Sequence, residues 1–177
     1  MPVERRRSPH RVLVTGGAGF IGSTLALECQ GRWPSARITV LDDFRSGDFN
    51  NLAGFQGDVV AAPAHEYHGG PRFDLIFHLA SITDTTVHDQ FLMIRDNVEG
   101  FRRILEIARE GNARVAYASS AAVYGQGAAL MDEEMAPKPA NVYAFSKAVL
   151  DTLARHAAAD GLRVTGVRYF NVYGPRE

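Results

Sequence analysis

The sequence predicts an α/β fold in which helices cover both faces of a doubly wound parallel sheet. From residue 11 onward, short apolar and β-branched segments alternate with longer segments of helical periodicity. A glycine-rich segment, residues 16–22, directly follows the first apolar segment. The 177 residues, 46% hydrophobic and 22% charged, suit one globular domain. We expect this domain over residues 11–177, behind a flexible basic tail over residues 1–10.

The first half of the chain contains four apolar segments of strand length. The first reads RVLVT and the second RITVL, the third is shorter and weaker, and the fourth reads FDLIFHL. An apolar segment of helical length follows the glycine turn. We therefore expect strands over residues 11–15, 37–41, 55–59 and 73–79, and a helix over residues 20–29.

The second half repeats the alternation. Apolar residues at spacings of three and four predict a long helix over residues 86–110, ended by Gly111. A fifth strand, a further helix and a sixth strand follow, and a loop with two prolines precedes the last helix. We expect these elements over residues 114–118, 141–159 and 162–169, with the loop over residues 128–140.

Composition excludes several classes of function. The formal net charge of -1 provides no polycationic surface for nucleic acid, and no apolar run is long enough to span a membrane or to resemble a signal peptide. The lone cysteine, Cys29, favours a reducing, cytoplasmic location. His65 and His68 are too few for a metal site. We expect no nucleic-acid, membrane or metal partner.

The glycine turn carries the clearest chemical signal. Gly16, Gly19 and Gly22 have the spacing of a dinucleotide-binding turn, between a buried strand and an apolar helix. Glycine lets the backbone approach a pyrophosphate, whose charge then lies at the helix N-terminus. The alternative is a merely flexible turn, which the position between strand and helix disfavours.

The second strand ends where the adenosine ribose of a dinucleotide would lie. Asp42 there is suited to accept hydrogen bonds from ribose hydroxyls and favours NAD, whereas Arg45 is suited to pair with the 2′-phosphate of NADP. The sequence leaves the cofactor open between the two, with NAD favoured. Asp58, after the third strand, is a candidate for adenine contact or for a helix cap.

Three polar residues in the second half suit proton transfer. Tyr143 and Lys147 lie four residues apart on the expected last helix, so both side chains point from one face. A lysine ammonium beside a tyrosine stabilises the phenolate, which can take a proton from a hydroxyl. Ser120 follows the fifth strand, where such sheets place reactive groups. A helical Tyr–Lys pair or a Ser–Ser turn arises often without function, and the preceding dinucleotide turn strengthens the catalytic interpretation.

Five segments together carry a family resemblance: GGAGFIG (16–22), HLA (78–80), SSAAVYG (119–125), YAFSK (143–147) and RYFNVYGPR (168–176). With them the chain resembles the extended short-chain dehydrogenases/reductases of the NAD-dependent epimerase/dehydratase family, and within it the subgroup that epimerises an ADP-heptose. The resemblance implies a Rossmann fold and epimerisation of a nucleotide sugar through transient oxidation by NAD or NADP. Ala121 and Ala122 replace the acidic residues that a dehydratase of this family would need.

The resemblance also implies roles for individual residues. Ser120, Tyr143 and Lys147 would form the catalytic set, and Thr83, Ser120 and Asn171 would contact substrate. The cofactor would be lined, besides Tyr143 and Lys147, by Gly16, Gly19, Phe20, Ile21, Gly22, Asp42, Asp43, Arg45, Asp58, Val59, Leu79, Ala80, Ser81 and Asn97.

Family members are about twice as long as this chain, and their C-terminal half binds the nucleotide sugar. We therefore expect the C-terminal substrate domain to be absent here, so that the chain is the cofactor-binding and catalytic half of an epimerase. The alternatives are a non-catalytic NAD(P)-binding module, a subunit that needs a separate substrate-binding half, and a UDP-hexose 4-epimerase. By the same resemblance we expect a homodimer through the helices at 86–110 and 141–159.

Overall fold

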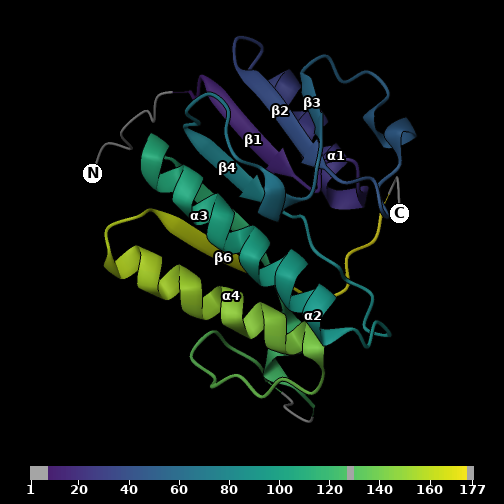
Figure 1. The fold of residues 1–177 in the computed structure, drawn as a ribbon, viewed down its shortest axis with the longest axis vertical. Coiled ribbons are helices and arrows are strands. Elements are labelled where there is room, and N and C mark those ends of the chain that lie inside the picture. Colours follow the sequence, from purple (N-terminus) through teal and green to yellow (C-terminus); the bar gives the residue numbers. More distant parts are fainter. Residues whose placement is uncertain (1–7, 127–129, 175–177) are drawn as a thin grey trace.

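Six parallel strands form one sheet in the order β3-β2-β1-β4-β5-β6 (Figure 1). A computed structural model describes residues 8–126 and 130–174. The chain runs outward from β1 to β3 and then returns to build β4, β5 and β6 on the other side. This confirms the doubly wound sheet. The strands are β1 (Arg11–Thr15), β2 (Arg37–Asp42), β3 (Asp58–Ala61), β4 (Leu75–His78), β5 (Arg114–Ser120) and β6 (Val164–Tyr169).

The helices lie on both faces of the sheet. They are α1 (Phe20–Arg32), α2 (Gln90–Met93), the π-helical η3 (Ile94–Glu99), α3 (Gly100–Gly111) and α4 (Val142–Ala159), with short 3-10 turns η1 (Phe49–Leu52), η2 (Ala64–Glu66) and η4 (Ala121–Tyr124). In Figure 1, α3 and α4 run side by side across the front of the sheet, while α1 lies beside β1 and β2.

Alternate residues of the central strands supply the two halves of the core. Leu13 and Ile76 belong to the larger apolar cluster, which packs against α3 and α4. Val12 and Val14 point to the opposite face and pack against α1. Because both faces of β1 are buried, its sequence is apolar without interruption, as expected for a central parallel strand.

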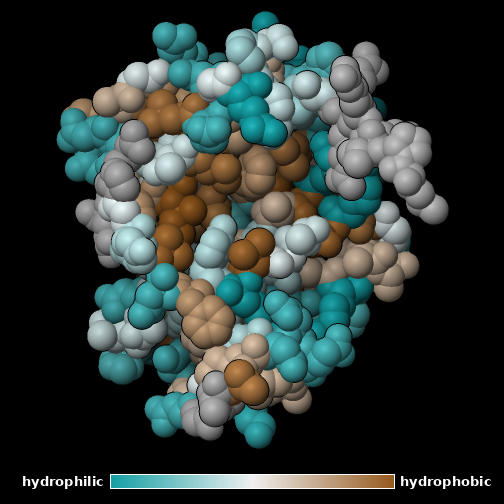
Figure 2. Space-filling model, turned by 180° about the vertical axis from the view of Figure 1, so that it is seen from behind, coloured by the Kyte–Doolittle hydropathy of each residue, from teal (hydrophilic) through white to brown (hydrophobic). Residues whose placement is uncertain are grey.

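The sheet face opposite α3 and α4, on which α1 packs, is only partly covered. Seen from behind, apolar side chains gather in a hollow at the centre of the molecule (Figure 2). Leu75 and Phe77 of β4 are half-buried on the α1 side, and Val167 of the edge strand β6 is 44% exposed. Apolar side chains of the sheet are therefore partly exposed to solvent on this face.

The third strand lies later than expected. The predicted range, 55–59, overlaps only its beginning, because Phe55 closes a turn through a hydrogen bond from its N–H to the Leu52 carbonyl. Gly57 then passes so close to β2 that a Cβ on it would lie 2.2 Å from the Ile38 carbonyl oxygen. Pairing begins only at Asp58, opposite Thr39. The apolar Phe55 belongs to the turn, where it packs against the smaller apolar cluster, on the α1 side of the sheet.

The long helix expected over 86–110 is shorter and contains three segments. It begins at Gln90, where the Asp89 side chain accepts a hydrogen bond from the Leu92 N–H. It continues through the π-helical η3 into α3 and ends beyond Gly111 at Asn112, whose φ of 52° is left-handed. Asparagine tolerates this conformation, so the residue after the glycine ends the helix.

The other boundaries differ by a few residues. Strand β5 runs on to Ser120, so that residue ends the strand instead of following it, and β4 and β6 are shorter than expected. Residues 1–7 of the expected tail lie outside the described residues. Pro9 is buried and the His10 N–H donates to Asp74 Oδ2 at 2.8 Å, so contact with the sheet begins before Arg11. Within the described part of the chain, no helix is long and apolar enough to cross a membrane.

Candidate active site

A cleft of about 920 Å³ opens at the carboxyl edge of the sheet. Its walls come from the glycine turn after β1, the end of β2, the loops after β3 and β4, the end of β5, and α4. After β1 the chain continues to β2 on one side, and after β3 it crosses to β4 on the other side of β1. Ligands of doubly wound sheets bind at this switch point, where the strand order reverses. The cleft therefore lies where the fold alone predicts a ligand.

The glycine turn fits closely against its neighbours and leaves the N-terminus of α1 open. A Cβ on Gly22 would lie 2.0 Å from the Gly16 carbonyl oxygen, and one on Gly16 would lie 2.6 Å from the Ala80 amide nitrogen. Gly19 is the N-cap of α1, where no side chain caps the helix and no acidic residue lies in the first turn. The amides of Gly16, Ala18 and Gly19 already donate to acceptors within the chain. The open first turn of α1 and its helix dipole face the cleft, which fits the pyrophosphate of a dinucleotide.

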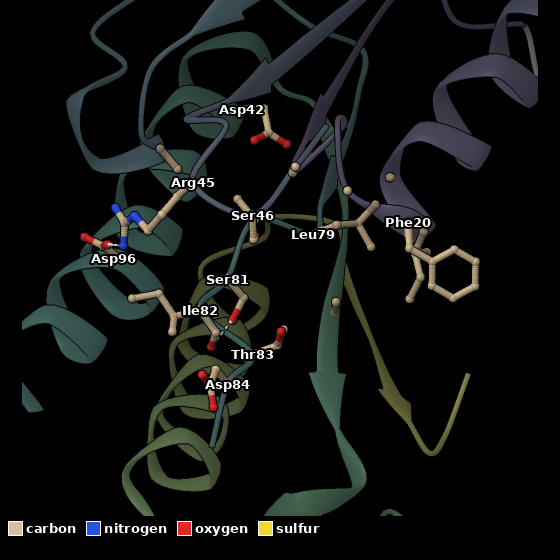
Figure 3. Close-up of a pocket in the computed structure, with 18 of the residues that line it drawn as sticks. Phe20, Asp42, Arg45, Ser46, Leu79, Ser81, Ile82, Thr83, Asp84 and Asp96 are labelled. Atoms are coloured by element: carbon tan, nitrogen blue, oxygen red, sulfur yellow. Dashed lines mark hydrogen bonds and ion pairs between the residues drawn. The ribbon is translucent and has the colours of Figure 1, made fainter. Parts of the chain in front are cut away.

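The end of β2 supplies acidic groups to the same cleft. Asp42 is 7% exposed, and its Oδ2 accepts from the Ala18 N–H at 2.8 Å while its Oδ1 accepts from the Phe44 N–H at 2.8 Å. These bonds join the glycine turn to the end of β2 and fix the direction of the carboxylate. Arg45 points away from Asp42, toward Asp96 of η3 (Figure 3).

A buried threonine joins the glycine turn to the loop after β4. Thr15 Oγ1 accepts hydrogen bonds from the Leu79 and Ala80 amides, both at 3.2 Å, and lies 2.8 Å from His78 Nδ1. Because the hydroxyl accepts two bonds, its own proton is directed to Nδ1. Burial, and secondly the charge of Lys147, lower the pKa of His78 to about 3. His78 is therefore a neutral structural link at the switch point.

Tyr143 and Lys147 meet in the cleft, on the face of α4 that the spacing predicted. The Lys147 Nζ lies 5.7 Å from the centre of the Tyr143 ring and donates to the Ala118 carbonyl of β5 at 2.9 Å. Burial lowers the pKa of Lys147 to about 8, and Asp151 partly opposes this effect. The ammonium thus stays largely charged at neutral pH beside the tyrosine. Ser120, where β5 ends, completes the group.

Two charged residues that sequence reasoning missed support α4 from beneath. Asp151 accepts from the Tyr117 hydroxyl at 2.8 Å and pairs with Arg168 of β6 at 2.9 Å. Desolvation, reinforced by the charge of Asp151, raises the pKa of Tyr117. Asp151 lies four residues after Lys147, one turn further along the same face of α4. This spacing is the sequence signal that could have indicated a buried charged residue beneath Lys147.

The cleft collects most, but not all, of the cofactor and substrate candidates. Asp58 and Val59 lie outside its lining, because β3 begins at Asp58 and only the residues after the strand, from Ala62 to His65, reach the carboxyl edge. Asp58 instead lines a separate hollow at the other end of β2. Those that do line the cleft are Gly16, Gly19, Phe20, Ile21, Gly22, Asp42, Asp43, Arg45, Leu79, Ala80, Ser81, Thr83, Ser120, Tyr143, Lys147 and Asn171.

Asn97 is buried behind the cleft wall and is not part of its lining. Its Oδ1 accepts from the Ile82 N–H at 2.8 Å, and its Nδ2 donates to the Ile82 carbonyl at 3.1 Å and to Ser146 Oγ at 3.0 Å. It therefore holds the loop after β4 against α4. Among the described residues, no group of three or more His, Cys, Asp or Glu side chains is arranged to hold a metal.

Comparison with known proteins places the chain in a family. The NAD dependent epimerase/dehydratase family matches residues 12–177. The chain belongs to this family. Two curated relatives are 37% identical over 94% of the chain: a UDP-N-acetyl-alpha-D-glucosaminuronate decarboxylase from Bacillus cytotoxicus and an ADP-L-glycero-D-manno-heptose-6-epimerase from Pseudomonas aeruginosa. The crystal structure of Helicobacter pylori ADP-L-glycero-D-manno-heptose-6-epimerase superposes with a TM-score of 0.86 and 42% identity, covering 96% of this chain and 57% of that one.

The chain spans about half the length of these family members, 56% and 52% of the two curated relatives. The decarboxylase and the epimerase match it equally well. The matched region of this chain holds the sheet, the glycine turn and the Tyr143–Lys147 pair, and the two curated relatives are named for different reactions.

Proposed function

We propose that this chain is the cofactor-binding and catalytic half of an NAD-dependent nucleotide-sugar epimerase of the ADP-heptose 6-epimerase type. One observation carries the proposal: the Tyr143–Lys147 pair faces the same cleft as the uncapped N-terminus of α1. A dinucleotide whose pyrophosphate is held at α1 would share this cleft with Tyr143 and Lys147. The identity of 42% to the Helicobacter pylori heptose epimerase supports the choice of reaction type.

The residues of the cleft suit proton transfer to and from a sugar hydroxyl. When bound, NAD would accept hydride from the sugar carbon and return it to the opposite face, which inverts that carbon. The Tyr143 oxygen takes the proton of the reacting hydroxyl and later gives it back. The Lys147 ammonium, held by the Ala118 carbonyl, stabilises the negative charge on that oxygen. Ser120 Oγ accepts from the Ala122 N–H at 3.1 Å, which leaves its proton for the substrate oxygen.

The nucleotide sugar is the proposed substrate, and Thr83 and Asn171 at the cleft mouth are its proposed contacts. We also propose a homodimer through the helices of residues 90–111 and α4. Phe91 and Phe145 support it, because they are 75% and 51% exposed on α2 and α4, which contact each other. A cytoplasmic location is proposed from the single buried, free cysteine, Cys29.

The first test is denaturing extraction of the purified chain, with mass spectrometry for a nicotinamide dinucleotide, followed by calorimetric titration of the emptied protein. We expect recovered NAD or saturable binding of added NAD. Absence of both overturns the cofactor assignment.

Catalysis is tested by adding the C-terminal half of a relative and following epimerisation of an ADP-heptose. The Tyr143→Phe variant should retain NAD binding and lose about a hundredfold or more in rate. Equal rates for the two proteins would show that Tyr143 carries no proton. Binding of NAD without turnover under any of these conditions would favour the non-catalytic module.

A further inference from the structure

One end of the cleft holds an arginine between two carboxylates. Arg45, on the loop after β2, pairs through Nη2 with Asp43 Oδ2 at 2.9 Å and donates through Nη1 to Asp96 Oδ2. Asp96 belongs to η3, 51 residues further along the chain. All three residues line the cleft, and Figure 3 shows the Arg45 side chain directed at Asp96, away from Asp42.

Asp96 is a firmly held partner for this arginine. Its side chain is 9% exposed, and its Oδ1 also accepts from Arg95 Nε at 2.8 Å. Burial acts to raise the pKa of Asp96, but hydrogen bonds from Arg95 and Arg45 outweigh it and hold the pKa below its ordinary value. Asp96 is therefore a carboxylate at neutral pH, and it draws one side of the guanidinium onto η3.

The arrangement matters because of the position of Arg45 in the fold. The end of β2 is where a doubly wound fold meets the adenosine ribose, and an arginine there accommodates the 2′-phosphate of NADP. To do so, its N–H groups must reach the phosphate oxygens. Here both Nη atoms of Arg45 face carboxylates, and the carboxylates of Asp42 and Asp43 add negative charge to the same wall.

We propose that Asp96 is a specificity-determining residue, which holds Arg45 in an ion pair so that the cleft binds NAD in preference to NADP. The inference rests on the proposed dinucleotide binding. It differs from selection by Asp42 alone, since Asp42 is bonded to the glycine turn and to the Phe44 amide and makes no contact with Arg45 among the bonds described above. Two segments distant in sequence thus jointly set the cofactor preference.

Calorimetric dissociation constants for NAD and NADP test the proposal on the emptied 177-residue chain. The wild-type chain should bind NAD more tightly than NADP. Asp96→Asn removes the more buried of the two charges that retain Arg45 and leaves only the pair with the more exposed Asp43, so NADP should bind about tenfold more tightly while NAD changes less than about threefold. Glu99→Gln is the matched control, because Glu99 is an exposed carboxylate of the same segment paired with Arg102. It should alter neither constant.

Arg45→Met provides a second variant at an exposed side chain, which protects the test if Asp96→Asn fails to fold. Because the ion pairs already withhold Arg45, its loss should leave NADP binding unchanged in the wild-type background and should cancel the gain in the Asp96→Asn background. The proposal is overturned if Arg45→Met alone weakens NADP binding, if folded Asp96→Asn binds NADP no better, or if the wild type prefers NADP. A wild type that binds neither dinucleotide would refute the proposed function instead.

Discussion

Replacing Lys147 by methionine should change how the stability of the protein depends on pH. The Lys147 side chain is 2% exposed, and its Nζ donates to the Ala118 carbonyl. Burial lowers its pKa from 10.5 to about 8, with Asp151 partly opposing the change. Charge on this amine is therefore tolerated less well in the folded chain than in the unfolded chain.

The sign and size follow from this shift. Between pH 8 and pH 10.5 the unfolded chain retains a proton that the folded chain has released, so the free energy of unfolding contributed by Lys147 rises with pH. Below pH 8 both states hold the proton, and the cost of burying the charge is fully present. The shift corresponds to about 3 kcal/mol over this pH range.

The assay is urea unfolding of the wild type and of Lys147→Met at several values between pH 7 and 10.5. The wild type should gain up to about 3 kcal/mol relative to the variant across this range. Cys29, whose pKa burial raises to about 11, acts in the opposite direction in both proteins and cancels in the difference. Thr152→Ser, a change on α4 without a titrating group, should differ from the wild type by a constant amount. A difference between wild type and Lys147→Met that stays flat or falls with pH would refute the reasoning.

Two further predictions concern α4. Asp151→Asn leaves the Arg168 guanidinium, 12% exposed, without its counter-charge, and should lower the free energy of unfolding by about 3–5 kcal/mol in urea titrations. Asp160→Asn, at an exposed ion pair, should change it little, and a similar loss in both variants would contradict the argument. Phe145→Ser should convert the proposed homodimer to a monomer in sedimentation experiments, whereas Phe49→Ser, at a still more exposed phenylalanine of η1, should not. A wild type that sediments as a monomer at high concentration would rule out the dimer.

Features set by short stretches of sequence could be predicted. The glycine turn follows from the spacing of Gly16, Gly19 and Gly22 after a buried strand, and the meeting of Tyr143 with Lys147 follows from one turn of helix. Each depends on neighbours within a few residues, so local periodicity is enough to place the side chains.

Features that depend on which segments pass one another could not be predicted. Asp96 faces Arg45 only because η3 crosses beside the end of β2, and no sequence spacing encodes that crossing. Asp58 was misplaced because one apolar residue, Phe55, belongs to a turn, which moves the start of β3 by three residues. A shift of this size moves Asp58 from near the carboxyl end of the strand to its first position, away from the cleft.

Asn97 has a consequence for motion in the cleft. Its amide group bonds Ile82 on one side and Ser146 on the other, so the loop after β4, η3 and α4 share one buried polar node. Separating η3 from either neighbour would leave the amide group of Asn97, which is fully buried, without some of its partners, at a cost comparable to a lost hydrogen bond for each. The three segments therefore open together or not at all, and amide hydrogens around this node should exchange with solvent as one cooperative unit.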